Sequence, residues 1–437
     1  MTYKKNDKIT LFWFRRDLRL KDNVGLFQAL KENQNVLPVF IFDTEILSKL
    51  PKKDARVLFI HQTIAAMKQV LQEKGYDLSV QLGKPIDVLK KLATEHEIAS
   101  IYTNHDYEPY ATERDGQIKK WCDSAQIEFK SFKDQCIFEK NEVVADSGKP
   151  YTVYTPYKKK WLKNLTAENL RAYPVEDFEK NFIKIKPISM ITLKQMGFED
   201  FPFAYPPKMT KKSILENYAE NRNFPALNDG TSRLGIHLRF GTISVREVAK
   251  VAQKLSDVWL SEIIWRDFFM QILWHYPAVQ DKSFRPQYEN IAWRTDKTEF
   301  QKWCAGQTGY PLVDAGMREL NETGHMHNRV RMVVASFLTK HLLMHWSLGE
   351  KYFAEKLLDY DLSANNGNWQ WAAGTGCDAA PYFRVFNPET QLEKFDKDNV
   401  YVKKWVPEFG TTKYVAPMVE HVFVRARALA EYKKGLT

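Results

Sequence analysis

Tryptophan is the residue type whose distribution first suggests chemistry. Of the 12 tryptophans, eight fall between positions 259 and 371: Trp259, Trp265, Trp274, Trp293, Trp303, Trp346, Trp369 and Trp371. Indole rings can stack on nucleic-acid bases or pass electrons to a cofactor. They can equally form an aromatic core, since tryptophan buries a large area at low entropic cost. The region after position 259 is therefore the candidate functional region of the chain.

Two stretches in this region place polar side chains at helical spacing. In SEIIWRDFFMQILW, Glu262, Trp265 and Arg266 stand at i, i+3 and i+4 and so share one face, with Ser261 as the expected helix cap. In HMHNRVRMVVASFL, the same spacing puts Asn328, Arg331 and Met332 on one helix face, with Arg329 close by. Surface ion pairs beside core residues would give the same patterns.

A third stretch is harder to explain without a ligand. Within ten positions before Trp369, the chain has six polar or flexible residues that make poor helix material, namely Asp359, Asp361, Asn365, Asn366, Gly367 and Asn368. Such residues need hydrogen-bond partners if they are buried, and a large polar ligand would supply them. Upstream, Thr231, Ser232 and Arg233 in NDGTSRLG precede an apolar helix and suit a phosphate, although a simple helix cap is an alternative.

Metal and nucleophile chemistry find little support. His341 and His345 are spaced i, i+4, but Leu342 stands where a zinc protease motif needs glutamate, so we expect packing or surface histidines and no metal. The chain has no G-x-S-x-G, no P-loop and no G-x-G-x-x-G after its first strand.

Composition sets further limits. Lys+Arg 64 against Asp+Glu 54 gives a net charge of +10, which favours a polyanionic partner without identifying it. The four cysteines are far apart, and neither a signal peptide nor a membrane-spanning segment is evident. We expect a cytoplasmic protein in a reducing compartment with no membrane partner.

The elements that must position these residues form two halves. Five short apolar strands at 8–14, 35–42, 77–82, 98–103 and 127–132 alternate with helical patterns at 23–33, 54–74, 85–96 and 111–125. This alternation predicts a doubly wound α/β fold with a parallel five-stranded sheet. Helical spacing at 213–221, 244–254, 260–275, 312–323, 327–346 and 350–358 predicts an all-α domain. The expected boundaries are 1–135, a proline-rich connector at 136–210, and 211–437.

Several motifs together resemble the photolyase/cryptochrome family, closest to the microbial class I cyclobutane pyrimidine dimer photolyases. They run in order over nearly the whole chain: FWFRRDLRLKDN (12–23), EPYATERDGQ (108–117), NDGTSRLG (228–235), WLSEIIWRDFF (259–269), TGYPLVDAGMREL (308–320), HMHNRVRM (325–332) and LLDYDLSANNGNWQWAAGTGCDAAPYFRVFNP (357–388). The resemblance implies an antenna domain joined by a connector to a helical domain that holds FAD, active in its reduced anionic form.

The resemblance also implies residue roles. Contacts to FAD are implied for Tyr218, Thr231, Ser232, Arg233, Leu234, Gly235, Arg266, Arg331, Asp359, Asp361 and Asn365. Many relatives carry serine where this chain has Gly235. Asn365 matches the residue facing flavin N5, where asparagine accompanies photolyases, aspartate plant-type cryptochromes and cysteine insect-type ones. An amide can bond the flavin without readily donating a proton, which favours the anionic reduced state.

The implied reaction is light-driven repair of DNA by a carbon–carbon lyase, in which an electron from the flavin splits a pyrimidine dimer flipped out of the duplex. The implied contacts to lesion or DNA are Arg222, Glu262, Trp265, Arg266, Asn328, Arg329, Met332 and Trp371. Glu262 and Asn328 would act on the dimer itself. Trp369, Trp346 and Trp293 match a relay that reduces oxidised FAD, whereas Trp303 is expected to be core.

Two other functions remain open within the family. A (6-4) photolyase is expected to present histidine rather than the arrangement from Asn328 to Met332. A cryptochrome-type sensor is disfavoured by Asn365, Glu262, Trp265 and Met332, and by the absence of a long tail after the family core. Phe40–Asp43, Lys53–Arg56 and Asn104–Arg114 are the expected walls of a second chromophore site, for which folate, deazaflavin, flavin and no antenna are all compatible. We expect a monomer.

Overall fold

The structure is a computed structural model, and it describes residues 8–436. Internal contacts divide the chain into two compact units. The first comprises the chain up to Glu139 with Leu165–Met209 and Leu234–Val251. The second comprises Lys140–Asn164, Thr210–Arg233 and the chain from Ala252 onward. Both units are therefore built from segments that are separate in the sequence.

The first unit contains the predicted parallel sheet. Its strands are β1 (Ile9–Phe14), β2 (Val36–Asp43), β3 (Ser79–Gly83), β4 (Ile98–Asn104) and β5 (Glu128–Phe132), in the spatial order β3-β2-β1-β4-β5. Every neighbouring pair is parallel. All residues of β1 and β2 are buried because helices cover both faces of the sheet. The prediction of a doubly wound five-stranded α/β fold is confirmed.

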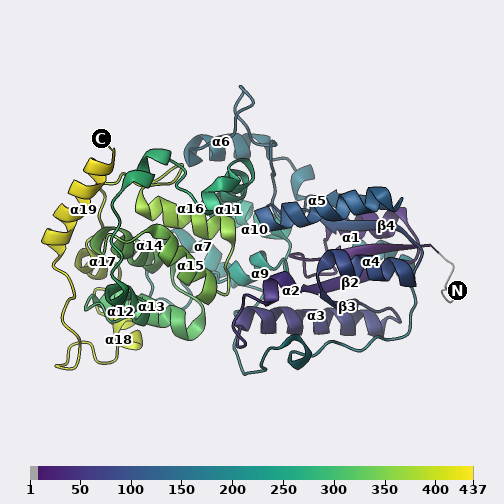
Figure 1. The fold of residues 1–437 in the computed structure, drawn as a ribbon, viewed down its shortest axis with the longest axis horizontal. Helices are drawn as coiled ribbons and strands as arrows, with labels where there is room; N and C mark the ends of the chain where they lie inside the picture. The colour runs from purple at the N-terminus through teal and green to yellow at the C-terminus, as the bar shows by residue number, and fades with distance from the viewer. Residues whose placement is uncertain (1–7, 437) are drawn as a thin grey trace. The chain divides into compact units, whose positions relative to one another are not determined.

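The helices of the first unit follow the strands. They are α1 (Val24–Glu32), α2 (Thr44–Leu47), α3 (Ala55–Glu73), α4 (Pro85–Glu95), α5 (Pro109–Ser124) and α9 (Gly235–Arg239), and α10 (Val245–Leu255) crosses the division between the units. Right-handed crossovers place α1 and α3 on one face and α4 and α5 on the other, and Figure 1 shows α3 and α5 on opposite sides of the strands. Ile9, Leu11 and Trp13 of β1 pack with Leu89 and Ile118 from α4 and α5.

The second unit is helical. Its helices are α6 (Tyr154–Asn164), α7 (Lys212–Glu216), α8 (Tyr218–Asn221), α11 (Asp257–His275), α12 (Lys297–Ala305), α13 (Pro311–Thr323), α14 (Asn328–Ser336), α15 (Trp346–Lys356), α16 (Leu362–Ala373), α17 (Pro388–Phe395), α18 (Val400–Trp405) and α19 (His421–Leu436). Its main core contains Trp303, Trp346 and Trp369. None of the helices within residues 8–436 is long and apolar enough to cross a membrane.

Two predictions about helices are wrong. The helix predicted over 327–346 is broken, because α14 leads into a π-helical turn η6 (Phe337–His341) and α15 starts only at Trp346. Leu343 has a φ of 52°, a left-handed conformation that interrupts a helix. The apolar spacing continues because Leu342 and Leu343 are buried without being helical. Conversely, Asn365, Asn366, Gly367 and Asn368, judged poor helix material, lie within α16, whereas Asp359 and Asp361 precede it.

An ion network ties distant segments of the first unit together. Arg19 Nη2 lies 2.8 and 2.7 Å from the two oxygens of Asp134, and Arg246 Nη2 lies 3.0 Å from Asp134 Oδ1. The carboxylate is almost fully buried. Burial raises the pKa of Asp134, but the two guanidinium groups outweigh it, so the net shift is downward. A carboxylate with a lowered pKa contributes stability above its unfolded pKa and loses it as the pH falls through its folded pKa.

Asp134→Asn should therefore lower the free energy of unfolding by about 3 kcal/mol, because it leaves two buried guanidinium groups without their shared countercharge. The measurement is urea denaturation at neutral pH followed by circular dichroism. Glu97→Gln is the matched control, since Glu97 pairs with Lys8 on the surface of the same unit and should change the value by about 0.5 kcal/mol or less. Equal effects of the two variants would contradict this account.

Candidate functional site

Helix α11 presents the first group of predicted site residues. Glu262, Trp265 and Arg266 are half-buried, whereas Ile263, Ile264 and the residues from Asp267 to Leu273 are buried. The three side chains thus lie on the face of the helix that is left accessible. Ser261 is not the cap that was predicted: the N-cap is Ser256, five residues earlier, the helix starts at Asp257, and Ser261 Oγ donates to the Asp257 carbonyl at 2.8 Å. The cap was misplaced because serine suits either position.

The acid on this face is paired with a base from another segment. Arg222 Nη1 donates to Glu262 Oε1, and both side chains are partly exposed. Lys158 of α6 donates to Ser261 Oγ at 2.5 Å, next to the acid. Burial raises the pKa of Glu262, and the positive charges of Arg222 and Lys158 partly offset that rise. Two residues assigned separately to DNA contacts are therefore brought together.

The indole on this face is already in contact with other rings. Tyr154 of α6 stacks on Trp265 with centroids 3.5 Å apart and planes 4° from parallel, and Phe269 stacks at 5.4 Å. The Tyr154 hydroxyl donates to the Ser261 carbonyl at 2.9 Å. Tyr154 thus fixes the orientation of the predicted apolar wall. It was missed because nothing in the sequence relates it to a helix more than 100 positions away.

The start of α14 provides the second group. His327 caps the helix through Nδ1, which accepts from the Arg329 backbone at 3.2 Å. Asn328 is exposed, while Arg329, Arg331 and Met332 are half-buried. Burial, above all, lowers the pKa of His327 to about 4. The imidazole is therefore neutral near neutral pH, which is the state that a cap acceptor requires.

The two arginines of α14 have different partners. Arg329 Nη2 donates to Asn223 Oδ1 at 2.7 Å. Arg331 Nη2 reaches both oxygens of Asp359 at 3.2 and 3.0 Å, and its Nε donates to the Met326 carbonyl at 2.7 Å. Arg331 and Asp359, both predicted to contact the cofactor, therefore form a pair with fixed geometry.

Helix α16 carries the third group. Asp361 is its N-cap and accepts from the Ala364 backbone at 3.2 Å. Asn365 Nδ2 donates to the backbone carbonyl of Glu350 at 3.0 Å and to Glu350 Oε1 at 2.9 Å. Because a backbone carbonyl can only accept, the nitrogen must face Glu350. Within residues 8–436 the Asn365 oxygen accepts no hydrogen bond from the protein, so it is the atom left for a ligand.

Glu350 is a site residue that the sequence analysis missed. It is buried, and burial raises its pKa, with the hydrogen bond from Asn365 acting in the opposite direction. It lies on α15 one residue after Gly349. Only a hydrogen bond between helices reveals its role, and no spacing within one motif predicts it.

The three tryptophans of the predicted relay differ in exposure. Trp369 and Trp346 are buried, and Trp293 is half-buried. A Cβ atom on Gly349 would lie 2.1 Å from Cη2 of Trp369, so α15 needs a glycine there to accommodate the indole. Trp303, predicted to be core, is fully buried with its ring 6.1 Å from that of Trp369.

The predicted phosphate-binding residues are assigned to different units. Tyr218 is buried in α8, and Thr231, Ser232 and Arg233 belong with it to the second unit. Arg233 has a φ of 52°. Leu234 and Gly235 start the five-residue helix α9, which belongs to the first unit. Trp371, predicted to contact the lesion, is half-buried at the end of α16.

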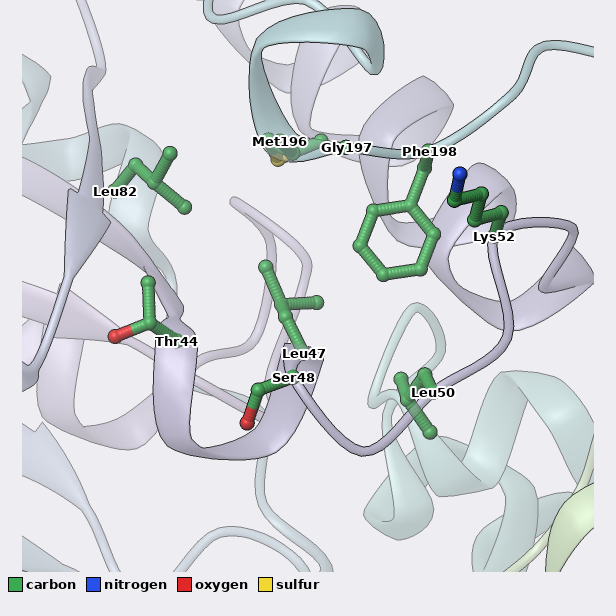
Figure 2. A pocket seen from close by; sticks show the side chains of 9 residues that line it. All are labelled: Thr44, Leu47, Ser48, Leu50, Lys52, Leu82, Met196, Gly197 and Phe198. Carbon is green, nitrogen blue, oxygen red and sulfur yellow. The ribbon is translucent and has the colours of Figure 1, made fainter.

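The first unit has a pocket of its own. Its volume is about 320 Å³, and it lies where β2 and β3 end, the edge at which open α/β sheets bind ligands. Figure 2 shows Leu47, Leu82 and Phe198 around it, with Lys52 nearby. The pocket adjoins two of the segments expected to hold a second chromophore. In the third, the Tyr110 hydroxyl donates to Asp43 Oδ2 at 2.6 Å.

The side chains of the second unit suit FAD. Hydroxyl and guanidinium donors can hold its phosphates, carboxylates its hydroxyl and amino groups, and the Asn365 oxygen an N–H donor of the ring. At the start of α14, His327 Nε2 and Arg329 Nε are buried and have no hydrogen-bond partner within the part of the chain that the structure describes. A polar ligand at this helix start would satisfy such atoms.

The chain matches known proteins at two levels, namely family models and a relative of nearly the same length. Residues 10–176 match the family model described as DNA photolyase, and residues 259–413 match the FAD binding domain of DNA photolyase. The deoxyribodipyrimidine photo-lyase of Synechococcus sp. is 36% identical, covering 94% of this chain and 93% of its own.

Two solved structures are also similar. A bacterial class III photolyase from Agrobacterium tumefaciens has a TM-score of 0.88 and 32% identity, covering 99% of this chain and 98% of its own. An archaeal photolyase from Sulfolobus tokodaii with two FAD molecules has a TM-score of 0.82 and 34% identity, covering 98% of this chain and 100% of its own.

Gly349→Ala should lower the free energy of unfolding by about 1–3 kcal/mol, because the added methyl group overlaps the Trp369 ring. Thermal or urea denaturation measures the change. Gly116→Ala in α5 is the matched control, since its Cβ meets no atom within 4 Å, and it should stabilise the protein by up to about 1 kcal/mol. An unchanged free energy of unfolding in Gly349→Ala would show that the indole can move aside.

Proposed function

The chain belongs to the photolyase/cryptochrome family, and from this premise we propose that it repairs DNA by splitting cyclobutane pyrimidine dimers in light. The observation that carries the proposal is the arrangement of Asn365, whose nitrogen is held by Glu350 and whose oxygen is left for a ligand. The relatives named deoxyribodipyrimidine photo-lyase support it over nearly the full length of the chain.

FAD is held by the residues that the family motifs indicate. Arg331 and Asp359 supply a fixed charge pair, and Tyr218, Thr231, Ser232 and Arg233 the phosphate end. Asp361, Arg266, Leu234 and Gly235 complete the proposed contacts. When bound and reduced, FAD would supply the light-driven one-electron chemistry that opens the cyclobutane ring.

Asn365 and Glu350 control the hydrogen bonding at the flavin ring. The Asn365 oxygen accepts a hydrogen bond from the ring and has no proton to give. Glu350 prevents the amide from turning over, because its backbone carbonyl would then face an oxygen. Arg331 balances negative charge on the cofactor. These residues keep the anionic state that repair requires.

The accessible face of α11 and the start of α14 receive the flipped lesion. Glu262 and Asn328 hydrogen-bond the dimer, while Trp265, Met332 and Trp371 provide the apolar surface. Stacking on an indole is worth about 1–3 kcal/mol per base, which offsets much of the cost of extruding a damaged pair. Photolyases are among the established examples of base flipping. Arg222, Arg266 and Arg329 contribute charge for the phosphates, so binding weakens as salt increases.

The tryptophans have a separate role in activation. Electrons pass from Trp293 through Trp346 to Trp369 and reduce the oxidised cofactor, whereas repair itself does not need this route. Its three rings belong to one unit of the structure.

The pocket of the first unit supports a second, light-harvesting chromophore. The Sulfolobus tokodaii photolyase contains two FAD molecules. Folate, deazaflavin and flavin remain the candidates in this chain. The monomeric state and the cytoplasmic location stay predictions.

Repair of an oligonucleotide with one cyclobutane thymine dimer tests the proposal, using purified, reduced protein in blue light and in darkness. We expect the two thymines to be restored only in light. No restoration by protein with fully reduced flavin would favour a (6-4) photolyase or a sensor, and the same assay on a (6-4) lesion separates these two.

Glu262→Ala should lower the quantum yield of repair while leaving the flavin content unchanged. Losing a hydrogen bond of about 1 kcal/mol to the dimer slows its splitting by roughly five-fold relative to wild type. Glu220→Ala is the control, because Glu220 lies on the exposed side of the short helix α8. A wild-type quantum yield in Glu262→Ala would show that Glu262 has no role in the repair reaction.

A further inference from the structure

The segment between η6 and α15 places a histidine against two tryptophans of the proposed relay. The centroid of the His345 ring lies 5.3 Å from that of Trp346 and 5.4 Å from that of Trp293. Trp346 is fully buried, and Trp293 is half-buried. A titratable side chain is therefore in contact with both indoles, where the sequence predicted a packing or surface histidine.

The imidazole has a structural reason to stay neutral. His345 is the N-cap of α15, and its Nδ1 accepts from the Ser347 backbone at 3.2 Å and lies 2.7 Å from Ser347 Oγ. Protonation of Nδ1 would remove the acceptor that the cap requires. It would also place a positive charge at a helix N-terminus, which already carries partial positive charge. Burial, above all, lowers the pKa of His345.

The charged groups around His345 come from two elements. Glu289 of the 3-10 turn η5 (Pro286–Asn290) favours the protonated ring, and Lys351 of α15 disfavours it. Tyr432 of α19, whose ring lies 5.7 Å from that of Trp293, stays protonated because burial raises its pKa well above the ordinary value. Acidification therefore changes the charge in contact with the two indoles chiefly at His345.

We propose that His345 makes the passage of positive charge from Trp369 onto Trp346 and Trp293 dependent on pH. One electron leaves the Trp293 indole and fills the vacancy on the Trp346 indole, so a positive charge moves to Trp293, which a thiol reductant in solution then neutralises. A neutral His345 does not oppose this charge, whereas an imidazolium repels it on either ring. The inference rests on the relay in the proposed function.

Photoreduction of oxidised flavin in the holoenzyme tests this, under blue light with a thiol reductant. The wild-type rate should fall about ten-fold or more between about pH 8 and about pH 5. His345→Asn and His345→Asp both keep a capping oxygen, and their rates should stay within about two-fold over the same range. His96→Asn, at the C-cap of α4, should follow the wild type. If the photoreduction rate of both capping variants falls as much as that of the wild type over this pH range, the inference is overturned.

A dark measurement gives a readout that does not depend on the flavin reaction. The ring of His345 is titrated by NMR in isotopically labelled holoenzyme, and its signal is identified by its loss in His345→Asn. The midpoint must coincide with the midpoint of the photoreduction profile. A ring that titrates while the rate stays constant, or a rate that falls at another pH, overturns the role of His345.

Trp346→Phe distinguishes failure of the tryptophan relay from failure of the role of His345 in it. Photoreduction at the wild-type rate in this variant would refute the relay, and the role of His345 with it. Loss of photoreduction in Trp346→Phe, combined with a wild-type rate that does not change with pH, would refute the role of His345 alone.

Discussion

Buried amide side chains on α16 form hydrogen bonds to other segments of the second unit and so fix the position of this helix in the candidate site. Asn366 Nδ2 and Gln370 Nε2 both donate to the Val279 carbonyl at 2.9 Å, and Gln370 Nε2 also reaches the Lys282 carbonyl at 3.1 Å. The preceding residue, Asn365, is bonded to Glu350 of α15. An unsatisfied buried amide costs about 1–3 kcal/mol, so these partners determine how α16 is rotated and which of its side chains face the ligand.

The dependence of α16 on partners that are distant in the sequence also explains which features can be predicted from sequence. The strands and the face of α11 follow from periodic apolar residues, and both are local patterns. Helix α16 contradicts its own propensity, because its amides bond to residues that are distant in the sequence. The break at Leu343 was missed for the opposite reason, since apolar residues remain buried through it. Tyr154, Glu350 and His345 depend on contacts between elements, which no single motif contains.

Charge in the site is balanced in pairs before any ligand is considered. Glu262 has Arg222, and Asp359 has Arg331. A partly buried ion is costly when it is alone and affordable when it is paired. Incoming phosphates or a flavin can thus exchange with an existing partner, so that binding rearranges charge pairs instead of creating isolated charges.

The bond between Asn365 and Glu350 also depends on the amide nitrogen of Asn365. Replacing the amide nitrogen by oxygen would put two carboxyl groups face to face, and like charges at such a distance force one of them to keep a proton. A pocket that stores an electron would then contain an acid able to protonate what it stores. Under the proposed function, the identity of this one atom decides whether an amide or an acid lies beside the reduced flavin.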